Sequence, residues 1–243
     1  MPFNFYDAIT AGLWATTVMT AFLALALALG FIHLDFARLL GGIFLPLERK
    51  AEWVGLLLHM AIGVLFGLLY GFLFSWIDLK PILWMTITVG LGFGLYHWVL
   101  SMPLISIGRI LNRHIKAGEE RDPGTWGIQF GPQEALVRLF AYLLYGGTFG
   151  LAWSLLAMVG QTALAGRGIG LLLAVLLAAI VIGVYTSWLH APAIEERYAF
   201  ASGSPSEGDL RDRERRALRQ RFERGEISWE QYQHLRRQFA AEP

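Results

Sequence analysis

The sequence has no cysteine, and only 16% of its 243 residues are charged. Without cysteine the chain cannot form disulfide bonds, thiolate metal sites or a cysteine nucleophile. It also has no phosphate-binding P-loop, no GxGxxG dinucleotide fingerprint, no HExxH zinc motif and no GxSxG nucleophile elbow. We therefore expect a protein that is not an enzyme and that carries no cofactor or metal ion.

Hydrophobic residues make up 55% of the chain, and the mean hydropathy is +0.48. They form runs of about 20 residues or more, the length that crosses roughly 30 Å of hydrocarbon. The runs predict an all-α, polytopic membrane helix bundle over residues 1–192, with the lipid bilayer as its surroundings. A polar linker, 193–209, and a small two-helix hairpin, 210–243, follow the bundle. The five predicted transmembrane helices cover about 8–32, 53–77, 82–107, 134–160 and 168–190.

Small residues recur every four positions within these runs. Residues four apart on a helix lie nearly above one another, so each series forms a ridge at which neighbouring helices can approach closely. The ridge from Gly55 to Gly71 includes a histidine, His59, among its glycines. Ridges occur in all five runs, and in the fifth the ridge is Ala179, Gly183 and Ser187. We expect them to be the packing seams of one bundle. The packing glycines are Gly55, Gly63, Gly67 and Gly71, then Gly90 and Gly94, and then Gly146 and Gly150.

The segments between the runs have patterns of their own. Residues 33–45 are apolar but too short to span, which predicts an interfacial or re-entrant segment that ends at Pro46. The connection between the second and third runs is short, so these two helices should be antiparallel neighbours. Residues 104–117 are amphipathic, which predicts a helix that lies in the interface plane.

Basic residues are distributed unevenly between the two sides that five crossings define. The N-terminus and loops of one side carry two, Lys80 and Arg167, whereas the loops of the other side carry eight. The positive-inside rule then places the N-terminus outside and the C-terminal tail in the cytoplasm. The eight are Arg38, Arg49, Lys50, Arg109, Arg113, Lys116, Arg121 and Arg138.

Five polar side chains fall in the cytoplasmic half of the predicted bundle: His59, His97, Glu134, Arg138 and Tyr142. Burying an ionisable group in hydrocarbon costs free energy, so we expect each of these side chains to have a hydrogen-bonding partner or a functional role. One interpretation is a pocket, open to the cytoplasm, that binds a proton, an anion or a small polar ligand. The other is hydrogen bonding between helices, with Glu134 paired to Arg138 and Arg138 snorkelling to the surface. The opposite half carries almost nothing ionisable, which argues against a through-pore.

Haem and metal sites are weaker alternatives. His59 and His97 have the right chemistry to ligate a b-type haem, but they are a single pair of residues. His33 and Asp35 are two residues apart in a connecting segment without clustered carboxylates. We expect the protein to bind neither a haem nor a metal ion.

The tail is arginine-rich and predicts two short helices. Gly225 is placed to end the first helix in a left-handed conformation, and Ser228 with Gln231 forms a capping box for the second. Acidic residues interleaved with the arginines argue against nucleic-acid binding. The apolar residues that should close this hairpin are Leu218, Phe222, Ile227, Tyr232, Leu235 and Phe239, which with Gly225 form the predicted oligomerisation or docking surface.

Two family resemblances follow from these residues. The stretch LRQRFERGEISWEQYQHLRRQF resembles the SHOCT family of short C-terminal domains of bacterial proteins, which implies oligomerisation or partner docking. More loosely, residues 50–155 resemble the YagU-like polytopic proteins, which implies a location in the bacterial inner (plasma) membrane. The residues that carry this second likeness are His59, Gly63, Phe66-Gly67, Tyr70, Gly94, His97-Trp98, Pro103, Tyr145-Gly146 and Gly150.

These features together predict a structural or regulatory membrane subunit, or a self-associating protein. Its hairpin would mediate oligomerisation, or would dock on other subunits of a membrane complex. The alternative is a transporter, or a proton-linked protein that binds a small ligand, and that uses the region of His59, His97 and Arg138. A third alternative is an intramembrane enzyme.

Overall fold

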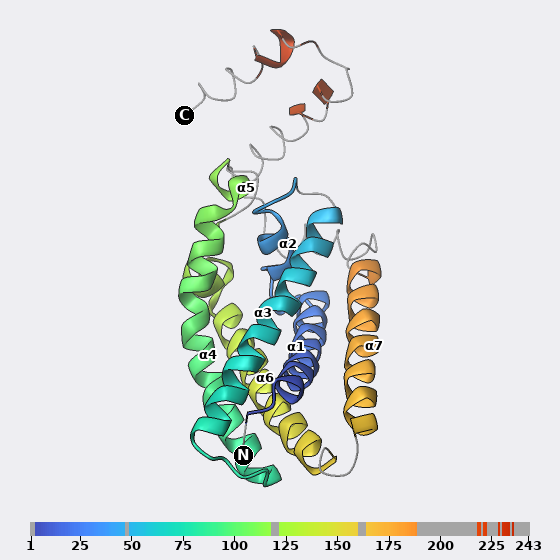
Figure 1. Ribbon diagram of the computed structural model, residues 1–243. Coiled ribbons are helices and arrows are strands. Elements are labelled where there is room, and N and C mark those ends of the chain that lie inside the picture. Colours follow the sequence, from blue (N-terminus) through green and yellow to red (C-terminus); the bar gives the residue numbers. More distant parts are fainter. Residues whose placement is uncertain are drawn as a thin grey trace.

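The computed structural model describes residues 3–46, 49–117, 122–159 and 164–188, and in the tail 218–219, 221–222, 228, 230–233 and 235. The secondary structure of these residues is helical, without a strand, as predicted. Five of the helices are long and apolar enough to cross a membrane, the number expected from the sequence. They form an elongated bundle (Figure 1). The long helices are α1 (Phe5–Ala28), α3 (Arg49–Trp76), α4 (Leu83–Leu111), α6 (Pro132–Val159) and α7 (Leu164–Trp188); the short ones are α2 (Phe36–Gly41), α5 (Arg113–Lys116) and the 3-10 helix η1 (Thr125–Phe130).

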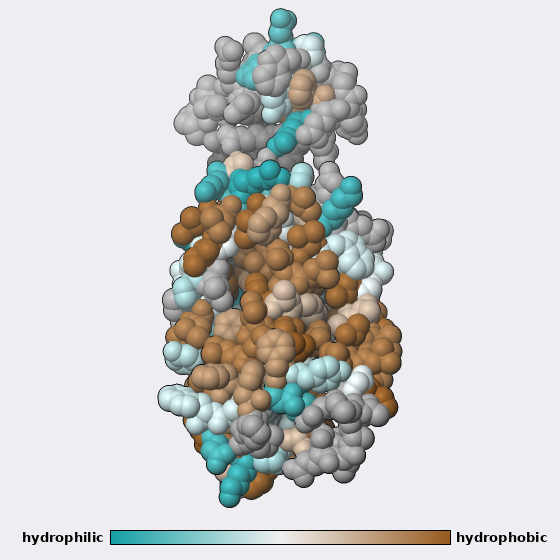
Figure 2. Space-filling view, in the orientation of Figure 1, coloured by the Kyte–Doolittle hydropathy of each residue, from teal (hydrophilic) through white to brown (hydrophobic). Residues whose placement is uncertain are grey.

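The outside of the bundle is largely apolar. Figure 2 shows a broad hydrophobic band over the helices, with hydrophilic side chains gathered toward the two ends. Two tryptophans, Trp76 and Trp84, are 75% and 69% exposed where α3 turns into α4. Soluble monomers rarely expose a continuous apolar surface of this extent, and exposed tryptophans at helix ends are typical of membrane interfaces.

The first helix begins at a side-chain cap. The Asn4 side-chain oxygen accepts the backbone N–H groups of Tyr6 at 3.0 Å and Asp7 at 3.1 Å. Asn4 is therefore the N-cap of α1. The helix ends before Gly30, whose φ of +78° reverses the chain at little steric cost.

α1 and α3 pack against each other along the glycine ridge of α3. A Cβ on Gly67 would lie 2.6 Å from the Cα of Gly12, well inside the normal contact distance of about 3.5–4.0 Å between carbon atoms. Gly63 and Gly71, one turn to either side, face side chains of α1. The backbones therefore approach this closely only because no side chain stands between them.

The start of the same ridge contacts α2 instead of α1. A Cβ on Gly55 would run into the carbonyl group of Ala37, and one on Gly41 into the carbonyl group of Ala51. The segment between α1 and α3 thus folds back as the short helix α2 and covers this end of α3.

A second glycine seam joins α4 and α6. Gly90 and Gly146 face each other so closely that a Cβ on either would collide with the carbonyl oxygen of the other. Gly94 and Gly150 each face the backbone of the opposite helix in the same way. The two antiparallel pairs, α1 with α3 and α4 with α6, are the tightly packed halves of the bundle.

Aromatic rings fill the space between the two seams. Tyr70 and Phe74 of α3 contact Phe93 of α4, with ring centroids 5.4 and 5.7 Å apart. Phe149 of α6 packs edge-on against the same two α3 rings at 5.3 and 5.5 Å, and it stacks on Trp153 at 5.8 Å. The consecutive helices α3 and α4 therefore contact through rings, and not through a glycine seam.

The predicted in-plane helix over 104–117 is wrong. α4 continues through Pro103 and ends only at Asn112, whose side-chain oxygen accepts the N–H of His114 at 2.8 Å and so starts α5. Ile107 and Ile110, whose apolar face suggested an interfacial helix, are exposed on the outside of α4. An apolar stripe beside basic residues has the same pattern in the last turns of a spanning helix.

The predicted ridge of α7 is not a packing seam. Ala179 and Ser187 are exposed, and a Cβ on Gly183 would meet no atom within 4 Å. The helix instead buries Ala174 and Ala178, and it lies along the outside of the bundle beside α1 (Figure 1). Four-residue spacing of small residues therefore does not by itself tell a packed face from an exposed one.

Candidate functional site

A buried ion pair at the start of α6 holds the chain that leaves α1. Glu134 Oε1 accepts the backbone N–H of His33 and, at 3.1 Å, that of Leu34. Arg138 Nη2 donates to the carbonyl oxygen of Leu34 at 3.0 Å and lies 3.6 Å from Glu134 Oε2. The two side chains thus bind both the amide and the carbonyl group of one residue, Leu34. We call this arrangement the Glu134–Arg138 clamp.

The expected pairing of Glu134 with Arg138 is present, but the expected snorkelling of Arg138 is wrong. Arg138 is 3% exposed and Glu134 is fully buried. The guanidinium group stays inside because a backbone carbonyl and a carboxylate are within reach there. Buried charges are tolerated where they are paired and hydrogen-bonded. The pairing of Glu134 with Arg138, and their bonds to the 31–35 segment, therefore account for the burial of both side chains.

His33 adds a third titratable group to this region. Its Nδ1 lies 3.7 Å from Glu134 Oε1, and its ring stacks on that of Phe130 with centroids 6.3 Å apart. The clamp therefore connects the segment after α1, the η1 helix and the first turn of α6.

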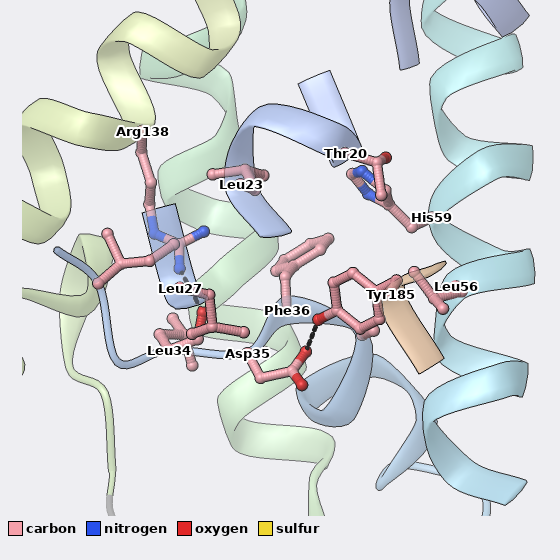
Figure 3. Close-up of a pocket in the computed structure, with 12 residues that line it drawn as sticks. Thr20, Leu23, Leu27, Leu34, Asp35, Phe36, Leu56, His59, Arg138 and Tyr185 are labelled. Atoms are coloured by element: carbon pink, nitrogen blue, oxygen red, sulfur yellow. Dashed lines mark hydrogen bonds between the residues drawn. The ribbon is translucent and has the colours of Figure 1, made fainter. Parts of the chain in front are cut away.

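A small cavity lies next to the clamp, between α1, α3, α6, α7 and the segment before α2. Arg138 and His59 reach it from opposite sides, and Asp35 with Tyr185 closes a third side (Figure 3). The Tyr185 hydroxyl donates to Asp35 Oδ1 at 2.6 Å, which ties α7 to the start of α2. The volume of the cavity, measured as the space open to the centre of a water molecule, is about 20 Å³. This is room for one or two water molecules and not for an organic substrate.

His59 lines the cavity with a ring nitrogen that lacks a hydrogen-bond partner among the described residues. The residue is 8% exposed, and its Nε2 atom is buried without a hydrogen-bond partner among the described residues. Its ring meets Phe36 edge-on, with centroids 5.4 Å apart. A buried imidazole nitrogen without a protein partner leaves one hydrogen bond open for a water molecule or another small polar species.

His97 and Tyr142 belong to the aromatic core and do not line the cavity. The His97 ring stacks on Phe66 with centroids 3.6 Å apart, and its Nδ1 lies 3.3 Å from the Tyr70 hydroxyl. Tyr142 and Tyr145 flank the same ring at 4.7 and 5.2 Å. His97 is thus enclosed by rings and hydrogen-bonded, as expected of a structural histidine.

The five predicted residues therefore divide into three groups. Glu134 and Arg138 form the clamp, His59 and Arg138 line the cavity, and His97 and Tyr142 lie in the ring core. The His97 ring is stacked on Phe66 and flanked by Tyr142 and Tyr145, so its surroundings give the haem alternative no support. Over the described ranges, no three His, Asp or Glu side chains are grouped so that they can hold a metal ion.

Sequence reasoning missed three polar residues. Asp35 Oδ1 has two hydrogen bonds. It accepts the Tyr185 hydroxyl, and it accepts the Arg38 N–H at 3.1 Å, which caps α2. Its position before a short apolar helix was a usable capping signal, whereas nothing in the pattern marks Tyr185. Asp7 is a single ionisable group, only 3% exposed, at the far end of α1, in the half where the sequence predicts almost none.

Comparison of the chain with protein-family models, with curated proteins and with solved structures gives no match. The resemblances to SHOCT domains and to YagU-like proteins therefore stay predictions from the sequence.

Proposed function

We propose that the protein is a non-enzymatic, integral membrane subunit of the bacterial inner membrane that acts through association. Its five long helices cross the bilayer, with the N-terminus outside and the C-terminal hairpin in the cytoplasm. The hairpin joins copies of this chain, or docks on other subunits of a membrane complex. The apolar outer band and the uneven distribution of basic residues support this placement.

The observation that carries the proposal is the filled interior of the bundle. Two glycine seams bring the backbones into contact, and buried rings occupy the space between them. The cavity at His59 has a volume of only about 20 Å³. A bundle whose interior is packed in this way is better suited to hold a shape than to transport or transform a molecule.

The described part of the tail supports a folded hairpin. Ser228 Oγ accepts the N–H of Gln231 at 3.2 Å, and Gln231 Oε1 accepts the N–H of Ser228 at 2.9 Å, the two bonds of a capping box. Phe222 and Tyr232 stack with ring centroids 5.0 Å apart. Gly225, Ile227 and Phe239, which complete the predicted docking surface, lie outside the described residues. A unit this small has too little core to be stable alone, which favours docking or self-association.

Deletion of 210–243 tests the proposal. We expect the full chain, solubilised in mild detergent, to migrate as an assembly on native gels, and the deletion variant to migrate as a smaller species. His59→Ala is the matched control, because it changes the cavity and leaves the tail intact. The same assembly size for the full chain and the deletion variant would show that the hairpin does not mediate association.

The unpartnered His59 Nε2 supports a second candidate, a proton-linked membrane protein that uses the cavity. The volume limits the ligand to a proton, a water molecule or a species of similar size. Proton flux into liposomes that contain the purified protein should then be abolished by His59→Ala and retained after deletion of 210–243. An absence of flux in the unchanged protein would rule this candidate out.

A further inference from the structure

One end of the bundle carries three exposed cationic side chains from two helices, α3 and α5. α5 is fixed to the segment around α2 because Asn112 Nδ2 donates to the carbonyl oxygen of Leu39 at 3.1 Å. His114 Nε2 makes a second contact, 3.0 Å from the carbonyl oxygen of Leu45. α2 in turn packs on the first turn of α3, where Gly41 meets Ala51. These contacts bring Arg113 and Lys116 of α5 to the same end as Lys50 of α3; we call the three the cationic corner.

The charges of the cationic corner are not neutralised by carboxylates of the described residues. All three side chains are exposed. The ion pairs among the described residues involve Arg109, Arg138 and His33, but none of the three. The Arg113 Nε lies 3.4 Å from Nε2 of the neighbouring His114 ring. A cluster of this kind attracts anionic groups.

An apolar shelf borders the cationic corner. Phe44, which follows α2, is 62% exposed, and Ile110 and Leu111 in the last turn of α4 are 56% and 54% exposed. Figure 2 shows hydrophilic side chains directly adjoining the hydrophobic band at the end where α5 lies. Cations beside an exposed apolar surface match a molecule with an anionic head and apolar chains.

We propose that the cationic corner binds the headgroup of an anionic phospholipid, with the acyl chains along the shelf of Phe44, Ile110 and Leu111. Lys50, Arg113 and Lys116 contact the phosphate. Nucleic acid fits less well, because it would leave the adjoining apolar shelf uncovered. The inference rests on the proposed membrane insertion and is independent of the proposed role in association.

Two lysines provide a matched test. Lys50 belongs to the cationic corner, and Lys80 is another exposed lysine, in the α3–α4 turn at the other end of the bundle. Native mass spectrometry of the full chain, delipidated in detergent and titrated with phosphatidylglycerol or phosphatidylcholine, measures binding of each lipid. We expect tighter binding of phosphatidylglycerol, weakened about five-fold by Lys50→Gln and by Lys116→Gln, as for a loss of ~1 kcal/mol per charge near an anionic surface. Lys80→Gln should leave it unchanged.

Two results would overturn the inference. One is equal binding of the two lipids, and the other is a loss in Lys80→Gln as large as that in Lys50→Gln. Unchanged phosphatidylcholine binding in each variant shows that the bundle remains folded. Alkaline extraction of membranes tests insertion separately: release of the chain would refute insertion, whereas a retained chain without lipid preference would refute the site alone.

Discussion

Removal of either member of the Glu134–Arg138 clamp should destabilise the bundle, but by unequal amounts. Glu134→Leu takes away the acceptor for the N–H groups of His33 and Leu34, and it leaves a buried guanidinium that cannot lose its proton. Breaking a buried pair in this way costs about 3–5 kcal/mol of unfolding free energy. Arg138→Leu leaves a carboxylate that still accepts two N–H groups and can also take up a proton. Its main loss is the bond to the Leu34 carbonyl, about 1–3 kcal/mol.

Equilibrium unfolding in detergent, followed by circular dichroism, measures these differences. The double variant Glu134→Leu/Arg138→Leu should cost less than the sum of the single variants, by about 0.5–3 kcal/mol, because it removes the unpaired charge. Asp122→Asn is the control: the Arg109–Asp122 pair is 3.3 Å long, but its side chains are 30% and 43% exposed. An exposed pair contributes about 0–1 kcal/mol. Equal and additive costs of the two leucine variants would refute the clamp.

Four further substitutions, one of them a control, test the seams and the cavity. Gly146→Ala should destabilise the bundle, because the added Cβ would collide with the backbone of α4. Gly92→Ala is the control, because a Cβ there meets no atom within 4 Å, and thermal unfolding in detergent compares the two variants. Tyr185→Phe should lower the unfolding free energy by about 0.6–1.7 kcal/mol through loss of the bond to Asp35, and should make α7 easier to release by limited proteolysis. His59→Leu should leave the unfolding free energy nearly unchanged or raise it, because it removes an unpaired buried nitrogen; a loss above about 2 kcal/mol would show that this nitrogen is bound to a partner.

The number and type of the long helices were predictable from the sequence. A long apolar run in a membrane has few stable structures other than a helix that spans it. The helices can therefore be identified without knowledge of the tertiary contacts. The capping signals are equally local, which is why the capping box of Ser228 with Gln231 in the tail could be named.

The faces of the helices were less predictable. Small residues at four-residue spacing occur on the packed ridge of α3 and also on the outward face of α7, around Gly183. The difference is whether another helix lies opposite, which the sequence of one helix does not contain. Gly55 is an intermediate case, because its partner is the short helix α2 and not a long helix.

The candidate site was predicted as a set of residues but not as an arrangement. Similar depth in the bundle suggested that His59 and His97 share a pocket, yet depth does not specify the side of the helix on which a residue lies. His97 faces the ring core, and His59 faces the cavity. Asp35 and Tyr185 were missed because their hydrogen bond joins residues 150 positions apart.

The most direct test of the central claim, a five-helix membrane bundle with its ends on opposite sides, is substituted-cysteine accessibility. The natural chain has no cysteine, so single variants can be made without removing any other thiol. Lys80 and Lys116 are both exposed, and they lie at opposite ends of α4. A membrane-impermeant maleimide should label Lys80→Cys in intact spheroplasts, and should label Lys116→Cys only after the membrane is permeabilised. Labelling of both variants in intact spheroplasts, or of Lys116→Cys alone, would contradict the account.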